Sequence, residues 1–148
     1  MAELKASQTA FDLIKQFEGL RLDAYLCPAH VWTIGWGHTA GVKADDRITV
    51  EQAAALLQED VAAVERDFPK VVHVPLAQGQ HDALVSLCFN LRGGAPGMAK
   101  IAPHLVASLN AGDFAKAADE LLDITHANGQ VLPGLVRRRQ AERELFIS

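Results

Sequence analysis

The chain has 148 residues, a length that suits one domain with a substantial hydrophobic core. Hydrophobic residues make up 49% of it and charged residues 22%, which is typical of a globular protein and excludes a disordered chain. The formal net charge of −4 argues against a nucleic-acid-binding protein, and two cysteines are too few for a disulfide scaffold.

The sequence also predicts where the protein resides. It has no apolar run of the length that a transmembrane helix needs, so we expect no membrane anchor. Residues 1–9 lack the basic and apolar segments of a signal peptide. We therefore expect the protein to remain in the cytosol that makes it until another component releases it.

The first predicted helix ends at a carboxylate. Apolar residues recur over 10–17 with the spacing of one helix face, and Gly19 follows as a typical helix stop. This places Glu18 at the helix C-terminus, where the backbone carries partial negative charge and an anion is unfavourable. A general acid must hold its proton near neutral pH, so the position suits that role.

A β-hairpin is predicted directly after this helix. Residues 20–27 alternate between apolar and polar, as in a half-buried strand, and residues 28–30 form a turn. Residues 31–36 are β-branched and aromatic, as in a returning strand. Gly35 and Gly37 indicate a bulge or the close approach of another backbone or a ligand.

The rest of the chain is predicted to be mainly helical. Thr49 and Gln52 form a capping box, and the helix behind it runs to about Phe68, where Pro69 stops it. Residues 69–75 are expected to be extended. The later predicted elements are a helix over 77–91, a glycine-rich turn over 93–97, and helices over 98–109, 113–125 and 133–147, with breaks at Gly112 and Asn128-Gly129.

Four separated motifs stand out in this order. The first is Glu18, eight residues, Cys27, five residues and Thr33, continued by the run Ile-Gly-Trp-Gly-His-Thr that ends at Thr39. The other three span residues 89–95, 109–113 and 129–146. Together they resemble the phage lysozyme (endolysin) family, glycoside hydrolase family 24.

This resemblance implies an α+β, mainly helical lysozyme-like fold in one domain over residues 1–148. A small N-terminal β-hairpin lobe (about 19–48) and a helical lobe (about 76–148) would flank a cleft, joined by a linking helix (about 49–68). The implied activity is that of an endolysin, a muramidase that hydrolyses the β-1,4 bond between N-acetylmuramic acid and N-acetylglucosamine in peptidoglycan. The expected outcome is host cell lysis.

The resemblance also assigns roles to residues. Glycoside hydrolysis needs an acid for the leaving oxygen and a second group on the far face that directs water or attacks. Glu18 would be the general acid, and Cys27 and Thr33 would place or activate the attacking water. Thr39 and Phe89 would line the sugar cleft and bind substrate.

The expected partners follow from the same family. They are bacterial peptidoglycan and a holin, the pore-forming partner that would release the enzyme from the host cytoplasm to the periplasm and cell wall. We expect a monomer without nucleic acid, cofactor or metal. The histidines show no paired spacing typical of a zinc site.

Several positions depart from the family pattern. Cys27 occupies a position where Asp is commoner, and the turn at Ala29-His30 replaces a usual Gly. Residues 100–102 and 124–126 replace a frequent Ser-Thr pair and a frequent Trp, respectively. A thiol ionises near pH 8.5, about four units above a carboxyl group, so Cys27 is open to interpretation as a base, a nucleophile or a polar group beside the water.

Two other functions stay open. Cys27 and His38 together would suit an amidase or peptidase acting on the peptide stems of the wall. A wall-binding relative that has lost activity through Cys27 is the non-enzymatic alternative. In the resembled family the equivalent of His38 is structural. Arg137 and Arg138 are both candidates for a buried ion pair, with either Glu18 or a neighbouring carboxylate as the partner.

Overall fold

A computed structural model describes residues 4–91, 93–127 and 129–148. The α-helices in these ranges are α1 (Gln8–Glu18), α2 (Val50–Asp67), α3 (Gln78–Asn90), α4 (Gly94–Ile101), α5 (Pro103–Asn110), α6 (Phe114–Leu121) and α7 (Pro133–Ile147). The strands are β1 (Arg21–Leu26), β2 (Trp32–Gly35), β3 (His126–Ala127) and β4 (Gln130–Val131), and η1 (Phe68–Lys70) is a 3₁₀ helix. The predicted α+β, mainly helical fold is confirmed.

The N-terminal helix and hairpin form as predicted. Helix α1 ends at Glu18, and Gly19 follows with a φ of 71°, which a residue without Cβ adopts at no steric cost. Strands β1 and β2 pair antiparallel, with an irregular register between Arg21 and Tyr25. At the turn between them His30 has a φ of 61°, a left-handed conformation that explains why glycine suits this position.

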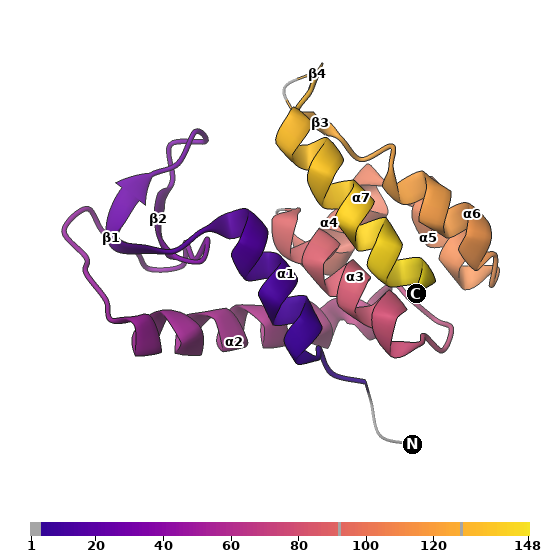
Figure 1. The fold of residues 1–148 in the computed structure, drawn as a ribbon, viewed down its shortest axis with the longest axis horizontal. Coiled ribbons are helices and arrows are strands. Elements are labelled where there is room, and N and C mark those ends of the chain that lie inside the picture. The colour runs from indigo at the N-terminus through magenta and orange to yellow at the C-terminus, as the bar shows by residue number, and fades with distance from the viewer. Residues whose placement is uncertain (1–3, 92, 128) are drawn as a thin grey trace.

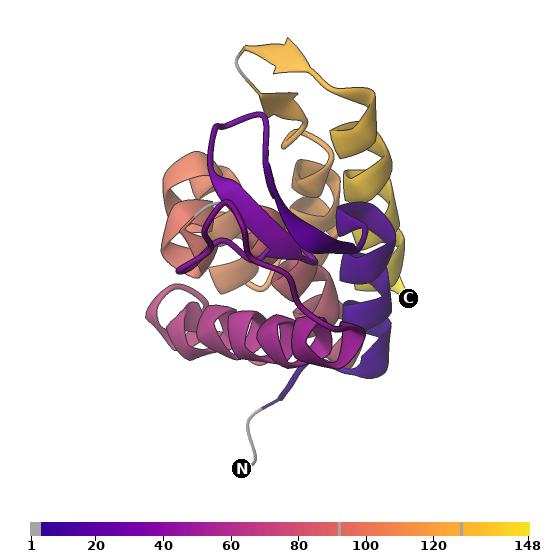
Figure 2. The ribbon, with the colours of Figure 1, turned by 90° about the vertical axis from the view of Figure 1, so that its left-hand side faces the viewer.

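Helix α2 connects the hairpin to the remaining helices (Figure 1). The predicted capping box is present: the Thr49 hydroxyl accepts from the Gln52 backbone N–H, and the Gln52 side chain accepts from the Thr49 N–H. Both contacts satisfy backbone donors that a helix start leaves without partners. In the view turned by 90°, α2 crosses beneath the hairpin and continues under the helical part (Figure 2).

Helix α3 lies at the centre of the helical part, where it packs against α1, α2, α4 and α7. Every residue from His81 to Cys88 is buried, so the helix is covered on all sides. Near its start Gly79 lets α7 approach closely, because a Cβ there would lie 2.6 Å from the Leu145 carbonyl oxygen. The predicted central helix is therefore confirmed, with bounds close to those expected.

Three predicted stretches differ from the structure. Residues 69–75 are not extended throughout, because Phe68–Lys70 form a 3₁₀ helix in which Pro69 is tolerated near the start. The glycine-rich turn expected over 93–97 is instead largely part of α4, where Pro96 occupies the first turn and needs no backbone donor. The helix expected over 98–109 is broken at Ala102, which precedes Pro103 and is forced out of helical geometry.

The helix expected over 113–125 is also too long, since α6 ends at Leu121. The chain then forms the small β3–β4 hairpin, closed by a hydrogen bond from the Leu132 N–H to the Thr125 carbonyl. The break at Gly129 is confirmed by a φ of 77°. Asn128, the other half of that predicted break, lies outside the described residues.

The two cysteines differ in environment. Cys88 on α3 is 1% exposed, and burial raises the pKa of its thiol well above the usual range, so it stays protonated. Cys27, just after β1, is only partly buried. Across the ranges that the structure covers, no helix has the length and apolar character needed to cross a membrane.

Candidate active site

The carboxylate of Glu18 lies where α1 leaves the helical part and enters the hairpin. Its side chain is 20% exposed, and Oε2 accepts a hydrogen bond of 2.5 Å from Nη1 of Arg138 on α7. The negative charge at the helix C-terminus is thus balanced by a guanidinium from the far end of the chain. Of the two arginines considered from the sequence, Arg138 makes this contact, whereas Arg137 is exposed.

Arg138 is itself held by a buried polar cluster. Its Nη2 donates to the Ser86 carbonyl at 3.1 Å, and its Nε donates to Glu142 Oε2 at 3.4 Å. The guanidinium also lies 5.7 Å from the ring of Phe17, a cation–π distance. With only 4% of its side chain exposed, Arg138 presents Nη1 to Glu18 from a fixed position.

Gly37 forms the wall on the other side of the Glu18 carboxyl. A Cβ at this glycine would lie 2.8 Å from Glu18 Oε1 and 3.6 Å from the ring of Phe89, and its φ is 78°. The sequence led us to expect a bulge or another backbone or ligand close to Gly37, and the group that the structure places there is the side chain of Glu18. Glu18, Gly37 and Phe89 meet at one point.

Cys27 and Thr33 are linked through one carbonyl group across the hairpin. The carbonyl oxygen of Val31 accepts from the Cys27 N–H at 3.1 Å and from the Thr33 hydroxyl at 2.9 Å. Thr33 is 4% exposed. Because its hydroxyl hydrogen is used by Val31, the lone pairs of Thr33 Oγ1 are left to accept.

His38 is held at the base of the hairpin. Its Nδ1 lies 2.8 Å from Asp60 Oδ2 on α2, and its Nε2 lies 2.9 Å from the Ala40 carbonyl oxygen. Both ring nitrogens therefore contact acceptors, and the ring connects the hairpin to α2. This arrangement leaves His38 no nitrogen with which to activate Cys27.

The two expected substrate contacts lie in different settings. Phe89, near the end of α3, is partly buried beside Gly37. Thr39 is exposed, and its carbonyl accepts from the Val42 N–H in the loop that follows the hairpin. Sequence reasoning missed Ser86 and Glu142; the only signal for Glu142 was its spacing of four residues from Arg138, which places both on one helix face.

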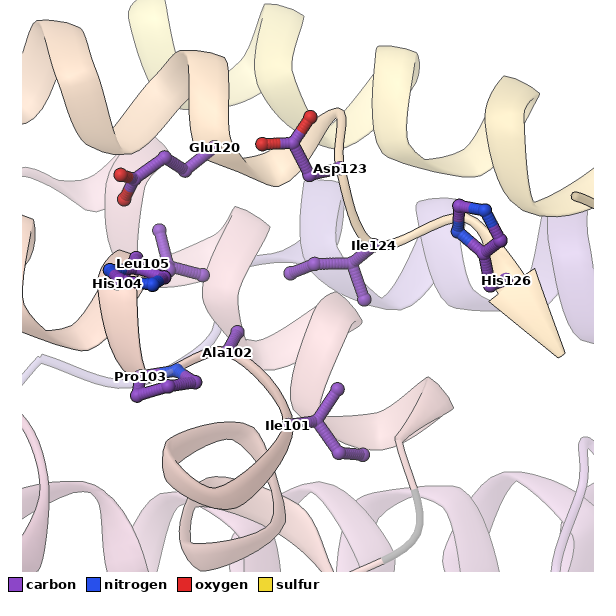
Figure 3. A pocket seen from close by; sticks show the side chains of 9 residues that line it. All are labelled: Ile101, Ala102, Pro103, His104, Leu105, Glu120, Asp123, Ile124 and His126. Atoms are coloured by element: carbon purple, nitrogen blue, oxygen red, sulfur yellow. The ribbon is translucent and has the colours of Figure 1, made fainter. Parts of the chain in front are cut away.

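A cavity of about 370 Å³ lies away from these residues, between α4–α5 and the segment from α6 to β3 (Figure 3). The apolar side chains of Ile101 and Ile124 face it together with the carboxylates of Glu120 and Asp123. Both downstream departures from the family pattern, residues 100–102 and 124–126, contribute to its lining. Within the described residues, no group of three or more His, Cys, Asp or Glu side chains could hold a metal ion.

Gly37→Ala tests how closely Glu18 is confined. The new methyl group would displace the Glu18 carboxyl, and a displacement of about 1 Å in an active site costs on the order of 100-fold in rate. We expect that loss in the clearing of a bacterial cell-wall suspension, followed as turbidity.

Gly41→Ala is the matched control. Gly41 has a φ of 71°, but a Cβ there would meet nothing within 4 Å. Both variants incur the left-handed backbone cost of about 1–2 kcal/mol, measured by thermal unfolding. Equal activities of the two variants would show that Gly37 does not confine Glu18.

Comparisons with known proteins agree with this geometry. The Phage lysozyme family model matches residues 15–142. The chain is 45% identical to the endolysin of Acyrthosiphon pisum secondary endosymbiont phage 1, over 96% of this chain and 97% of that protein. It is 39% identical to the endolysin of Bacillus phage B103 over 98% of its own length, but it spans only 55% of that relative.

A solved structure shows the same fold. The muramidase domain of SpmX from Asticaccaulis excentricus matches with a TM-score of 0.87 and 39% identity, over 99% of each chain. The family match covers most of this chain, and the endolysin match covers nearly the whole of both proteins. The chain therefore belongs to the phage lysozyme family and is a glycoside hydrolase.

Proposed function

We propose that this protein is an endolysin that acts as an N-acetylmuramidase on bacterial peptidoglycan. It would hydrolyse the β-1,4 bond between N-acetylmuramic acid and N-acetylglucosamine and so lyse the host cell. The observation that carries the proposal is the Glu18 carboxyl, fixed between Arg138 and Gly37. The names of the relatives, endolysin and muramidase, point to the same substrate.

Glu18 is the general acid in this proposal. Its Oε2 is bound to Arg138, so Oε1, beside Gly37, is the oxygen that would carry the proton to the leaving sugar oxygen. As the proton leaves, Glu18 becomes a carboxylate, and the guanidinium already in place stabilises the new charge. Phe89, beside Gly37, and the exposed Thr39 would bind the sugar.

Cys27 and Thr33 would place the attacking water. Thr33 Oγ1 can accept a hydrogen bond from that water, since its own hydroxyl hydrogen is donated to the Val31 carbonyl. This orients a lone pair of the water toward the sugar, with the Cys27 thiol beside it. We propose that the reaction inverts the configuration at the anomeric carbon. In an inverting enzyme the attacking water occupies a space between the two catalytic groups, here Glu18 and Cys27. A retaining enzyme needs no such space, because one of its groups bonds directly to the sugar.

The contacts of His38 with Asp60 and Ala40 disfavour the alternative of a Cys27–His38 amidase. Family membership likewise favours a glycosidase over a wall-binding protein without activity. Mass spectrometry of digested peptidoglycan distinguishes the three: new reducing sugar ends indicate a muramidase, new free amines an amidase or peptidase, and no products a binding protein.

Glu18→Gln should abolish lysis while the fold is retained. The amide keeps the shape of the side chain but has no proton to transfer, and general acid catalysis contributes about 10²–10⁴-fold to the rate. Turbidity assays and circular dichroism check this. Activity above about one-tenth of the wild type would exclude Glu18 as the general acid.

Substitutions of Cys27 test its role directly. If Cys27 only borders the water, Cys27→Ser should retain about one-tenth or more of the rate, and Cys27→Asp should also be active because it places a carboxylate opposite Glu18. If the thiol is the nucleophile, Cys27→Ser should lose several orders of magnitude, and a covalent sugar adduct should form on Cys27. Proton NMR of the first product gives its anomeric configuration, and retention would rule out the inverting mechanism.

Alkylation gives a second measurement of the same role. Iodoacetamide should label Cys27 selectively in the folded enzyme, because Cys88 is buried and its raised thiol pKa keeps it protonated. Under the water-placing role, loss of activity would reflect only the added bulk. Cys27→Ser, which cannot be labelled there, should then remain active in the presence of the reagent.

We further propose that the enzyme is held in the host cytoplasm and reaches the periplasm and cell wall only through a holin. This proposal rests on the similarity of the chain to proteins named endolysins, whereas its relatives from Escherichia phage P1 and Haemophilus phage HP1 are named SAR-endolysins. Expression in a bacterial host should therefore leave the cells intact, and chloroform or a co-expressed holin should lyse them within minutes. Lysis on expression alone would show another route of release.

A further inference from the structure

We infer that Glu142 and Ser86 are positioning residues for the reaction, acting on Glu18 through Arg138. This inference rests on the proposed role of Glu18 as the general acid. Both residues are fully buried, whereas the Glu18 side chain retains 20% exposure. They therefore lie behind the site, on the protein side of Arg138.

The contacts form a continuous chain from the core to the acid. Ser86 on α3 donates from Oγ to Glu142 Oε2 at 2.6 Å, and the same oxygen accepts from Arg138 Nε at 3.4 Å. The Ser86 carbonyl accepts from Arg138 Nη2. With Nε and Nη2 held in this way, the planar guanidinium has only one direction left for Nη1, which is toward Glu18.

The charges of this cluster are balanced. Two carboxylates, Glu18 and Glu142, face two guanidinium groups, Arg138 and Arg139. Glu142 Oε1 lies 3.0 Å from Arg139 Nε, and both of these side chains are fully buried. Burial raises the pKa of Glu142 and lowers that of Arg139, while each opposes the shift of the other.

Glu142 consequently limits how strongly the arginines act on Glu18. Arg138 is attracted to both Glu142 and Glu18. Each of these carboxylates therefore weakens the attraction between Arg138 and the other carboxylate. Without the charge on Glu142, two buried cations would be opposed by Glu18 alone. The two guanidinium groups would then stabilise the carboxylate form of Glu18 more strongly, which opposes the proton transfer that the reaction needs.

The neighbouring groups on the hairpin and on α1 do not provide the charge balance that Glu142 provides. On the hairpin side, the residue that lies against the Glu18 carboxyl is Gly37, which carries no charge. On α1 itself, the ammonium of Lys15 lies 4.7 Å from the centre of the Trp36 ring. Arg138, with Arg139 next to it on α7, therefore supplies the positive charge whose balance depends on Glu142.

The test is Glu142→Gln, which keeps the shape of the side chain and removes its charge. On soluble peptidoglycan fragments we expect kcat to fall about tenfold with little change in KM, because substrate contacts are untouched. The alkaline limb of the pH–activity profile should move to lower pH by about half a unit or more. Ser86→Ala, a milder change that loosens Glu142, should shift kcat and the profile in the same direction by less.

Asp82→Asn is the matched control. Asp82 is a buried carboxylate on the same helix as Ser86, but it accepts from the Ser7 N–H and from Gln78 Nε2 and does not contact Arg138. It should lower the melting temperature and leave the pH profile unchanged. An equal shift in Asp82→Asn would attribute the effect to general destabilisation and overturn the inference.

The remaining outcomes separate the two proposals. If Glu142→Gln does not fold, the kcat and the pH profile of Ser86→Ala alone decide whether the positioning role holds. A folded variant with the wild-type kcat and pH profile overturns the positioning role, provided that Glu18→Gln is inactive. Activity in Glu18→Gln would instead overturn the proposed general acid itself.

Discussion

The active site depends on one ion pair between the two ends of the chain. Glu18 and Arg138 are 120 residues apart, and their contact is formed only when α7 packs on the central helix α3. The same packing buries Arg138 against Ser86 on α3 and against Glu142, so the docking of α7 and the formation of the Glu18 contact occur together. The hairpin, in contrast, forms between strands that are close in sequence, and His38 connects it to α2 through Asp60.

The hairpin contributes the second constraint, which is the space beside the carboxyl. Gly37 leaves room for Glu18 Oε1, and the single carbonyl of Val31 fixes both Cys27 and Thr33. The position of the Glu18 carboxyl is therefore fixed on one side by the charge of Arg138 and on the other by Gly37, which has no side chain. Such two-sided confinement favours one orientation of the carboxyl group, which is what the proposed role of Glu18 as a preorganised acid requires.

The sequence predicts best those parts of the molecule whose structure depends on neighbouring residues in the chain. The C-terminus of α1 at Glu18 and the capping box at the start of α2 follow from periodicity and helix signals. The break at Ala102 has a local cause in Pro103, but the apolar pattern on either side hid it. The sequence alone does not show whether Arg137 or Arg138 contacts Glu18. The side of α7 that is buried depends on its packing against α3, which is distant in sequence, and this packing selects Arg138.

The buried charges of α7 argue for function over stability. A helix that packs on the core normally presents apolar residues to it, yet α7 buries Arg138, Arg139 and Glu142 together with Phe146. Replacing such a cluster by well-packed apolar residues is often neutral or stabilising. Arg138 has a direct use in its contact with Glu18, and Glu142 is the group that balances the charge of Arg138 in a place where water cannot. The cost of burying these charges is then a consequence of placing the Arg138 guanidinium behind Glu18, because the counter-charge of Arg138 has to be buried with it.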